Sequence, residues 1–351
     1  MPMQLETRNR EAFELVTEAL EYIDQYRVSR DIARLQDATA RLIQATEKDP
    51  NYFRARYYDA IVDDLSGRFK PAAAKFRGLL EQSPPLADEV RYNLGLAEYH
   101  GYSHPALERA IEQFELVLKS VKDIALRLRA RAGLAQACAM HMIPQEYDKP
   151  DVPQIKHYRS LTFNSLDEVF RQLHVPLLQR LNPFRHPLID SGAAAEIRWT
   201  AHNAKGMMLM YAADYLPQLD EVPQASSRQR QVDTVQSALS QLTEAEHIKA
   251  DDWANRCDLA SAKMRLGYFD GKPDLFDEAL VILQDVIDRL RPGYAFAIYE
   301  SGRVLRLQRK FSAAIKRFDD ALAIPTDQRD VSERRLRKER ERAQKEDYTF
   351  P

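Results

Sequence analysis

The fold is decided by residues 51–84, which read NYFRARYYDAIVDDLSGRFKPAAAKFRGLLEQSP. Apolar residues recur every three or four positions on both sides of Gly67, so the stretch predicts two helices, 52–65 and 70–82, joined by a tight turn. Pro84 stops the second helix, because proline lacks the N–H that a helix interior needs. The stretch is therefore an antiparallel helix hairpin.

The second helix of this hairpin carries a pattern that returns elsewhere in the chain. The pattern is two apolar residues four apart, a third apolar residue three positions on, and a proline after five more. It occurs as Ala38-Leu42-Ala45-Pro50, as Ala72-Phe76-Leu79-Pro84 and, one residue shorter at its end, as Ala314-Phe318-Ala321-Pro325. Pro50 and Pro84 are 34 residues apart, and a fixed period of this size is typical of stacked helix hairpins.

A small residue also precedes two of these patterns by twelve positions, Ala60 before Ala72 and Gly302 before Ala314. With the 34-residue period, this resembles the tetratricopeptide repeat family, whose units carry small residues where their two helices cross. The resemblance implies an all-α fold, a right-handed α-solenoid with a concave groove for partners. We expect Phe76, Phe114 and Phe318 to be buried, each against the small residue of its own hairpin.

Helical periodicity extends over most of the chain. It predicts about seven antiparallel helix hairpins, at 9–47, 52–82, 87–120, 124–182, 191–248, 252–290 and 293–323. A charged helix at 328–346 is expected to be a solvated cap, which terminal repeats need. The expected segments are N-terminal repeats 1–141, a Pro-rich insertion loop 142–163, degenerate repeats 164–250, C-terminal repeats 251–326, and a capping helix with its tail 327–351.

The insertion carries large side chains, Tyr147, Tyr158 and Phe163, and its early prolines disfavour a helix there. Two interpretations stay open. Long loops in compact domains are often functional, so the loop could fold over the groove. Alternatively, it is a tolerated surface insertion, which costs little loop-closure entropy.

Composition and motifs argue against several classes of function. The net charge of −2 offers no field for nucleic acid or anionic membrane, and no apolar run reaches the length of a membrane span. No phosphate-binding glycine loop or nucleophile elbow occurs, and the 8 histidines and 2 cysteines lack metal-ligand spacing. We therefore expect no enzyme activity, cofactor, metal or nucleic-acid partner. Few cysteines and a start without a signal segment favour the cytoplasm.

The remaining hypothesis is a protein-interaction scaffold that binds a segment of another protein, expected to be acidic. The resemblance places one set of side chains in the groove: Arg54, Tyr57, Tyr92, Tyr99, Arg127, Asn203, Met207, Met210, Tyr211, Tyr299, Arg303 and Arg306. Tyr and Arg are typical of binding hot spots, and Tyr92 and Tyr99 are expected to be exposed without the partner. The alternatives are a regulatory sensor for a peptide or small ligand, and a non-catalytic subunit of an enzyme complex.

Overall fold

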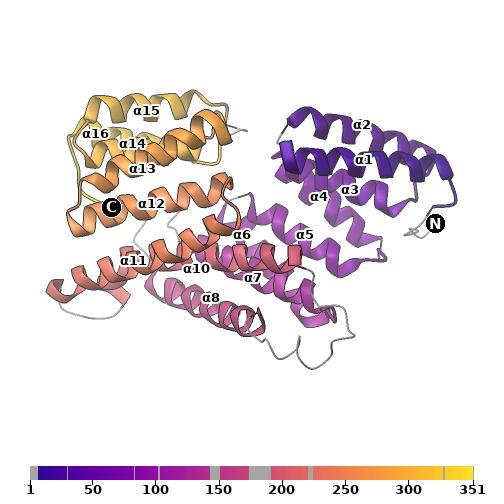
Figure 1. Ribbon diagram of the computed structural model, residues 1–351, viewed down its shortest axis with the longest axis horizontal. Coiled ribbons are helices and arrows are strands. Elements are labelled where there is room, and N and C mark those ends of the chain that lie inside the picture. Colours follow the sequence, from indigo (N-terminus) through magenta and orange to yellow (C-terminus); the bar gives the residue numbers. More distant parts are fainter. Residues whose placement is uncertain are drawn as a thin grey trace. The chain divides into compact units, whose positions relative to one another are not determined.

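The computed structural model shows a chain of helices (Figure 1), and no strand occurs in the residues that it describes. Those residues are 7–29, 31–82, 84–101, 103–142, 151–173, 191–219, 224–326 and 329–350. In chain order the helices are α1 (Arg10–Ser29), α2 (Ile32–Lys48), α3 (Phe53–Leu65), α4 (Phe69–Glu81), α5 (Ala87–Tyr99), α6 (His104–Ser120), α7 (Ile124–His141), α8 (Val152–Leu173), α10 (Ser191–Leu219), α11 (Gln224–Ile248), α12 (Trp253–Asp270), α13 (Asp274–Asp285) with the π-helical turn η1 (Val286–Leu290), α14 (Ala295–Leu307), α15 (Phe311–Ala323) and α16 (Glu333–Gln344).

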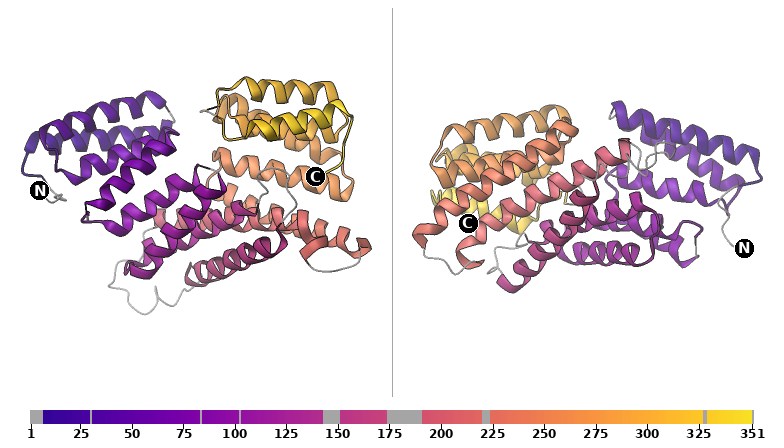
Figure 2. Two further views of the ribbon diagram at one scale, coloured as in Figure 1. Left: turned by 180° about the vertical axis from the view of Figure 1, so that it is seen from behind. Right: turned by 60° about the horizontal axis from the view of Figure 1, so that its bottom comes forward.

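The chain divides into two compact units, Met1–Gly133 (unit 1) and Leu134–Pro351 (unit 2). Each unit is a stack of antiparallel hairpins, which Figure 2 shows from two further directions. Successive helices pack as pairs, α1 with α2, α3 with α4 and α5 with α6 in unit 1, and α10 with α11, α12 with α13 and α14 with α15 in unit 2. The predicted all-α hairpin architecture is confirmed within the described residues.

Both units have an inner and an outer layer of helices. The first helix of each hairpin also contacts the first helix of the next, as α3 does with α5 and as α12 does with α10 and α14. These first helices form the inner layer, and the second helices form the outer one. Side chains on the inner layer therefore meet those of neighbouring repeats, which is where a binding face of stacked hairpins is built.

The predicted small-on-large packing holds the hairpins together. Phe114 is fully buried, and its ring lies between Gly95 of α5 and Gly133 of α7. A Cβ added at these two glycines would lie only 2.7 and 2.8 Å from the ring. Phe318 is likewise fully buried against Gly302, and Phe76 is 1% exposed in a cluster that includes Ala60 and Ala72. These burial predictions are confirmed.

The predicted insertion loop is wrong over residues 152–163, which form the first half of α8. Pro153 is the second residue of that helix, where the missing N–H has no partner to lose. Tyr158 packs its ring against His141 at a centroid distance of 4.2 Å, and Phe163 is 44% exposed. Tyr147 lies outside the described residues.

Candidate functional site

The inner layer of unit 2 contains buried ion pairs, which are unusual in a protein interior because charge is costly to desolvate. Arg265 of α12, 4% exposed, donates from Nε and Nη2 to both carboxylate oxygens of Asp214 of α10, at 3.0 to 3.1 Å. On α14, Arg303 donates from Nη1 to Oε1 of Glu300, one helical turn before it, at 2.8 Å. Ser261 of α12 donates its hydroxyl to the other oxygen of Glu300 at 2.9 Å, which links α12 to α14.

Burial and charge act in opposite directions on these carboxyl groups. Burial raises the pKa of Asp214 above its ordinary value, and Arg265 reduces that rise. Burial also acts to raise the pKa of Glu300, but attraction to Arg303 and Arg265 outweighs it, so this pKa is lowered. The two carboxyl groups and the two guanidinium groups thus form one compensated cluster along the inner layer.

A second buried polar network begins at Asn203 on α10. Its amide nitrogen donates to Oδ2 of Asp258 at 3.0 Å and to the side-chain oxygen of Asn255 at 3.1 Å. Its own side-chain oxygen accepts a hydrogen bond from Gln136 of α7 at 2.9 Å. Burial is the main cause that raises the pKa of Asp258 to about 7, so this acid titrates near neutral pH.

The C-terminal residues 345–350, called the tail below, return to this inner layer after α16. The fully buried Arg306 of α14 donates from Nη1 to the backbone carbonyl oxygens of Asp347 and Thr349, at 2.6 and 2.9 Å. Its Nε donates to the buried carboxylate of Glu339 on α16 at 2.8 Å. Figure 1 marks the C-terminus beside α12. The tail is therefore held through its backbone as well as through its side chains.

The last described residue of the tail, Phe350, packs against α12. Its ring centroid lies 5.3 Å from that of Tyr268 and 5.6 Å from that of Phe269. The guanidinium carbons of Arg265 and Arg303 each lie 5.3 Å from the same ring centroid. An aromatic ring between two arginines and two aromatic side chains gains both apolar burial and cation–π attraction. We call the surface formed by these four residues and Arg306 the tail site.

Eight of the predicted groove residues are buried, with exposed fractions of 9% or less: Tyr99, Asn203, Met207, Met210, Tyr211, Tyr299, Arg303 and Arg306. The expected exposure of Tyr99 is wrong. Those in unit 2 are covered because neighbouring inner helices contact one another directly, and the tail covers Arg306. The structure brings Arg303 and Arg306 together at the tail site and places Met207, Met210 and Tyr211 in one core cluster.

Sequence reasoning missed most of the tail site. Tyr268 and Phe269 stand at the end of α12, and Arg265 lies one turn before them, so helical spacing already places Arg265 and Phe269 on neighbouring positions. One feature of the sequence points to a packed role for Phe350, namely that this aromatic residue follows a highly charged helix. Nothing local in the sequence pairs these two segments, which are about eighty residues apart.

The four remaining groove residues, Arg54, Tyr57, Tyr92 and Arg127, are half-buried in unit 1. The hydroxyl of Tyr57 on α3 accepts a hydrogen bond from Asn93 of α5 at 2.7 Å, which ties two neighbouring inner helices together. Arg127 donates to the carbonyl oxygen of Val121 at 3.1 Å, at the turn before α7. This partly exposed set, here called the unit 1 inner face, lies on the inner helices α3, α5 and α7.

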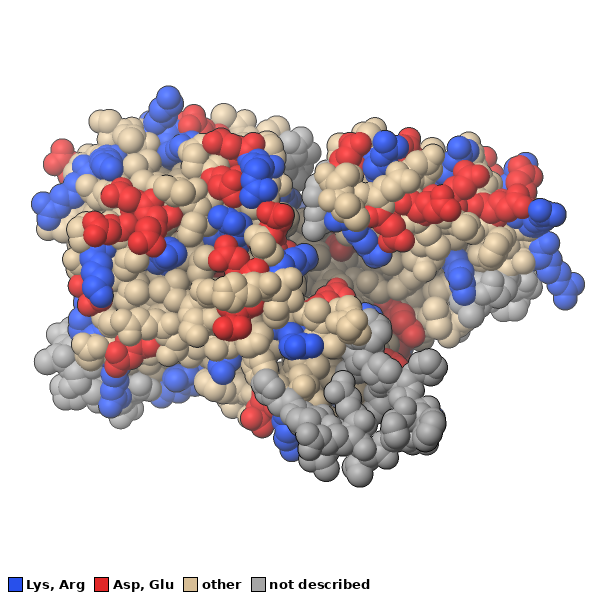
Figure 3. Space-filling view, in the orientation of Figure 1, with Lys and Arg blue, Asp and Glu red and all other residues tan. Residues whose placement is uncertain are grey.

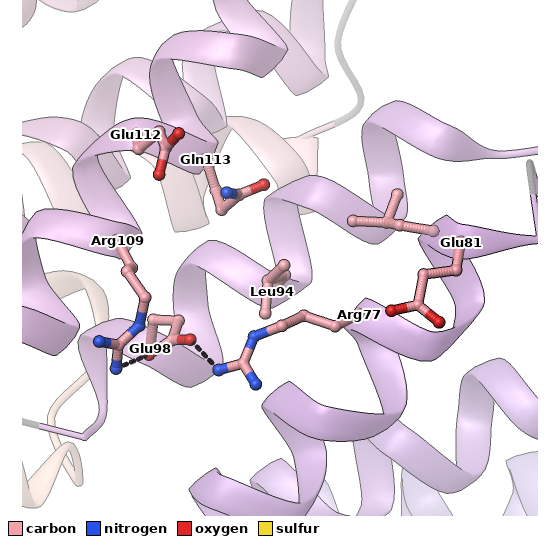
Figure 4. A pocket seen from close by; sticks show the side chains of 8 residues that line it. Arg77, Glu81, Leu94, Glu98, Arg109, Glu112 and Gln113 are labelled. Atoms are coloured by element: carbon pink, nitrogen blue, oxygen red, sulfur yellow. Dashed lines mark hydrogen bonds and ion pairs between the residues drawn. The ribbon is translucent and has the colours of Figure 1, made fainter.

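A cavity of about 320 Å³ opens elsewhere in unit 1, between α4, α5 and α6 (Figure 4). Its charged floor is Glu98, 4% exposed, whose two oxygens accept hydrogen bonds from Arg77 and Arg109. Burial acts to raise the pKa of Glu98, but the two arginines outweigh it and lower that pKa. Both oxygens are engaged, so the carboxylate links the outer helices α4 and α6 through α5.

Three further features of the described residues concern nucleic-acid binding, metal binding and membrane insertion. On the face in Figure 3, basic and acidic side chains lie interspersed over the described residues, which gives no continuous basic track there. Within the described ranges, no group of three or more His, Cys, Asp or Glu side chains is placed to hold a metal ion. In the same part of the chain, every helix is too short or too polar to cross a lipid bilayer.

Comparison with solved structures identifies the architecture. A tetratricopeptide repeat protein from Parabacteroides merdae superposes with a TM-score of 0.51 at 11% sequence identity, covering 95% of this chain and 99% of that one. The fold is that of a tetratricopeptide repeat protein.

Two further solved structures match more loosely. The complex of the TPR2AB domain of yeast Sti1 with pHSP90 has a TM-score of 0.31 at 11% identity, covering 95% of this chain and 98% of that one. Human IFIT1 with PPP-AAAA has a TM-score of 0.39 at 15% identity, covering 93% and 74%. No protein-family model matches the chain, and no curated protein matches it by sequence.

Proposed function

We propose that this tetratricopeptide-repeat chain is an interaction scaffold whose inner helical faces bind extended segments of other proteins. The observation that carries the proposal is the tail, a non-helical segment that already lies on inner helices of unit 2. Arg306 donates hydrogen bonds to two of its backbone carbonyl oxygens, and Phe350 packs its ring among side chains of α12 and α14. An inner face of this chain is thus chemically suited to hold extended backbone and an aromatic side chain.

The unit 1 inner face is the proposed site for a segment of a second protein. It offers the Arg and Tyr side chains that dominate binding energy at many interfaces, in Arg54, Tyr57, Tyr92 and Arg127. Arg54 and Arg127 favour a segment that carries Asp or Glu, because a guanidinium group pairs with a carboxylate. Such attraction weakens as salt screens the charges.

A peptide-display selection on the purified full chain tests this proposal. Segments selected at low salt should be enriched in Asp and Glu, and their affinity should fall as the salt concentration rises. Arg54→Ala should weaken binding of the selected segments by about tenfold or more, which corresponds to about 1.4 kcal/mol.

The matched control is Arg41→Ala, which removes another partly exposed arginine of unit 1 from the outer helix α2, where it pairs with Glu18 at 2.9 Å. This variant should bind the selected segments as the parent chain does. Equal losses in the two variants, or selected segments without acidic residues, would contradict an acidic-segment site on the unit 1 inner face.

A further inference from the structure

The tail leaves α16 through a tight reversal of the backbone. The amide of Glu346 donates to the carbonyl of Ala343 at 3.1 Å, and the amide of Asp347 donates to that of Arg342 at 2.9 Å. Glu346 itself has a φ of 55°, in the left-handed region, and the two hydrogen bonds complete a backbone cap with which many helices end. This cap reverses the chain at the end of α16, and hydrogen bonds from Arg306 further along hold the tail on unit 2.

Arg342 of α16 also contacts the tail and belongs to the tail site, and these contacts define what the site recognises. The Asp347 carboxylate accepts a hydrogen bond from Nε of Arg342 at 2.8 Å and closes a turn by accepting the amide of Thr349 at 2.8 Å. Arg342 and Arg306 both donate to the carbonyl oxygen of Thr349, at 2.6 and 2.9 Å. Phe350 then fills the space beside α12. The recognised pattern is a carboxylate followed three positions later by an aromatic ring, on extended backbone.

The tail differs from a permanent part of the core in its exposure. Asp347 and Phe350 are half-buried, Thr349 is exposed, and Tyr348 is 44% exposed over the guanidinium group of Arg309. By contrast, the pair formed by Arg306 of α14 and Glu339 of α16 beneath the tail, at 2.8 Å, involves no tail residue. Segments with few buried contacts open at lower free energy than the core around them. The surface beneath the tail would therefore persist when the tail leaves.

We infer that the tail is an internal ligand and that the tail site binds a segment of another protein with the same chemistry, a carboxylate three residues before an aromatic ring. The inference rests on the proposed scaffold function but concerns a second face, in unit 2. While the tail is docked, an incoming segment finds only the fraction of molecules whose tail has left, and its apparent affinity falls by that fraction. The tail thereby sets the threshold at which a partner binds.

The test uses the full chain and a fluorescently labelled peptide of the sequence KEDYTFP, which is residues 345–351. Phe350→Ala removes the ring that anchors the tail, so the labelled peptide should bind this variant more tightly than the parent chain, by about tenfold or more. Lys345→Ala is the matched control, because it removes an exposed side chain from the same tail. The control should bind the peptide as weakly as the parent chain. A peptide with alanine in place of its phenylalanine should not compete.

Equal peptide affinity for the parent chain and Phe350→Ala, or no binding to either, overturns the inference. Hydrogen exchange on the unaltered chain gives a check that no substitution can disturb. The amide of Thr349 should exchange at least about tenfold faster than the amides in the middle of α14, because tail opening precedes unfolding. Equal protection would make the tail a fixed part of the fold. If the parent chain sediments as a dimer, with each tail bound to the other copy, then the occupant of the site is a second copy of this chain.

None of these outcomes depends on the unit 1 inner face. If the display selection fails while the KEDYTFP peptide binds Phe350→Ala, the tail site stands and the unit 1 proposal falls. If acidic segments bind unit 1 and the peptide binds neither form of the chain, the reverse holds.

Discussion

Replacing Gly95 with alanine should destabilise unit 1, although alanine is the better helix former. The reason is the ring of Phe114, which lies between Gly95 and Gly133. An added Cβ at position 95 would lie 2.7 Å from Cε1 of the ring and 3.0 Å from two more of its carbons. On its other side the ring already packs closely against Gly133 of α7, where a Cβ would lie 2.8 Å away, so the ring has little room to retreat.

The size of the effect follows from two opposing contributions. Alanine gains about 0.8–1 kcal/mol over glycine inside a helix. Carbon atoms in ordinary contact lie about 3.5–4.0 Å apart, so the overlap is about 1 Å, and overpacking of a tight core costs about 1–3 kcal/mol. The difference between the two is a fall in the free energy of unfolding of up to about 2 kcal/mol. At Gly78 of α4 an added Cβ would meet no atom within 4 Å, so Gly78→Ala should instead raise it by about 0.5–1 kcal/mol.

Urea unfolding followed by far-ultraviolet circular dichroism measures both variants in the same unit. Both tryptophans, Trp199 and Trp253, lie in unit 2, so their fluorescence provides an internal reference that neither substitution should move. Adding Phe114→Leu to Gly95→Ala should relieve the overlap and show a coupling of about 1 kcal/mol in a double-mutant cycle. If Gly95→Ala stabilises unit 1 as Gly78→Ala does, the close packing of Phe114 is refuted.

Three further predictions concern unit 2, each checked by urea or thermal unfolding followed by tryptophan fluorescence. Phe318→Ala should lower the free energy of unfolding by about 3–5 kcal/mol, and a loss under about 1 kcal/mol would show that this ring is not a tightly packed core residue. The folded-state pKa of Asp258, about 7, lies above the ordinary value of 3.8, so the native form binds the proton more tightly and stability should fall as pH rises between these values. Asp258→Asn keeps an acceptor for Asn203 and should flatten that slope; an unchanged slope would assign it to other groups. Asp214→Asn should instead destabilise the unit by about 3–5 kcal/mol, because it leaves the buried guanidinium of Arg265 without its charged partner, and a neutral result would contradict that pairing.

Local spacing in the sequence carries the hairpins and their main packing contacts. Phe76, Phe114 and Phe318 are buried where the repeat pattern places them, because a small and a large residue at these helical steps lie opposite each other where the two helices of a hairpin cross. The error at α8 has an equally local origin. Prolines before residue 154 argue against a helix, yet Pro153 occupies the first turn, where proline is tolerated.

Local spacing thus specifies the repeat, the helix pairs and the aromatic core of each hairpin, since these depend on residues within one repeat length. Which inner side chains stay exposed depends instead on the tertiary structure. Arg303 and Arg306 fit the composition of a binding surface, but their carboxylate partners and the returning tail come from other parts of the chain and bury them. Helical periodicity specifies the side of a helix on which a residue lies. What covers that side depends on the stacking of neighbouring repeats and on the path of the last few residues, and no local spacing encodes either.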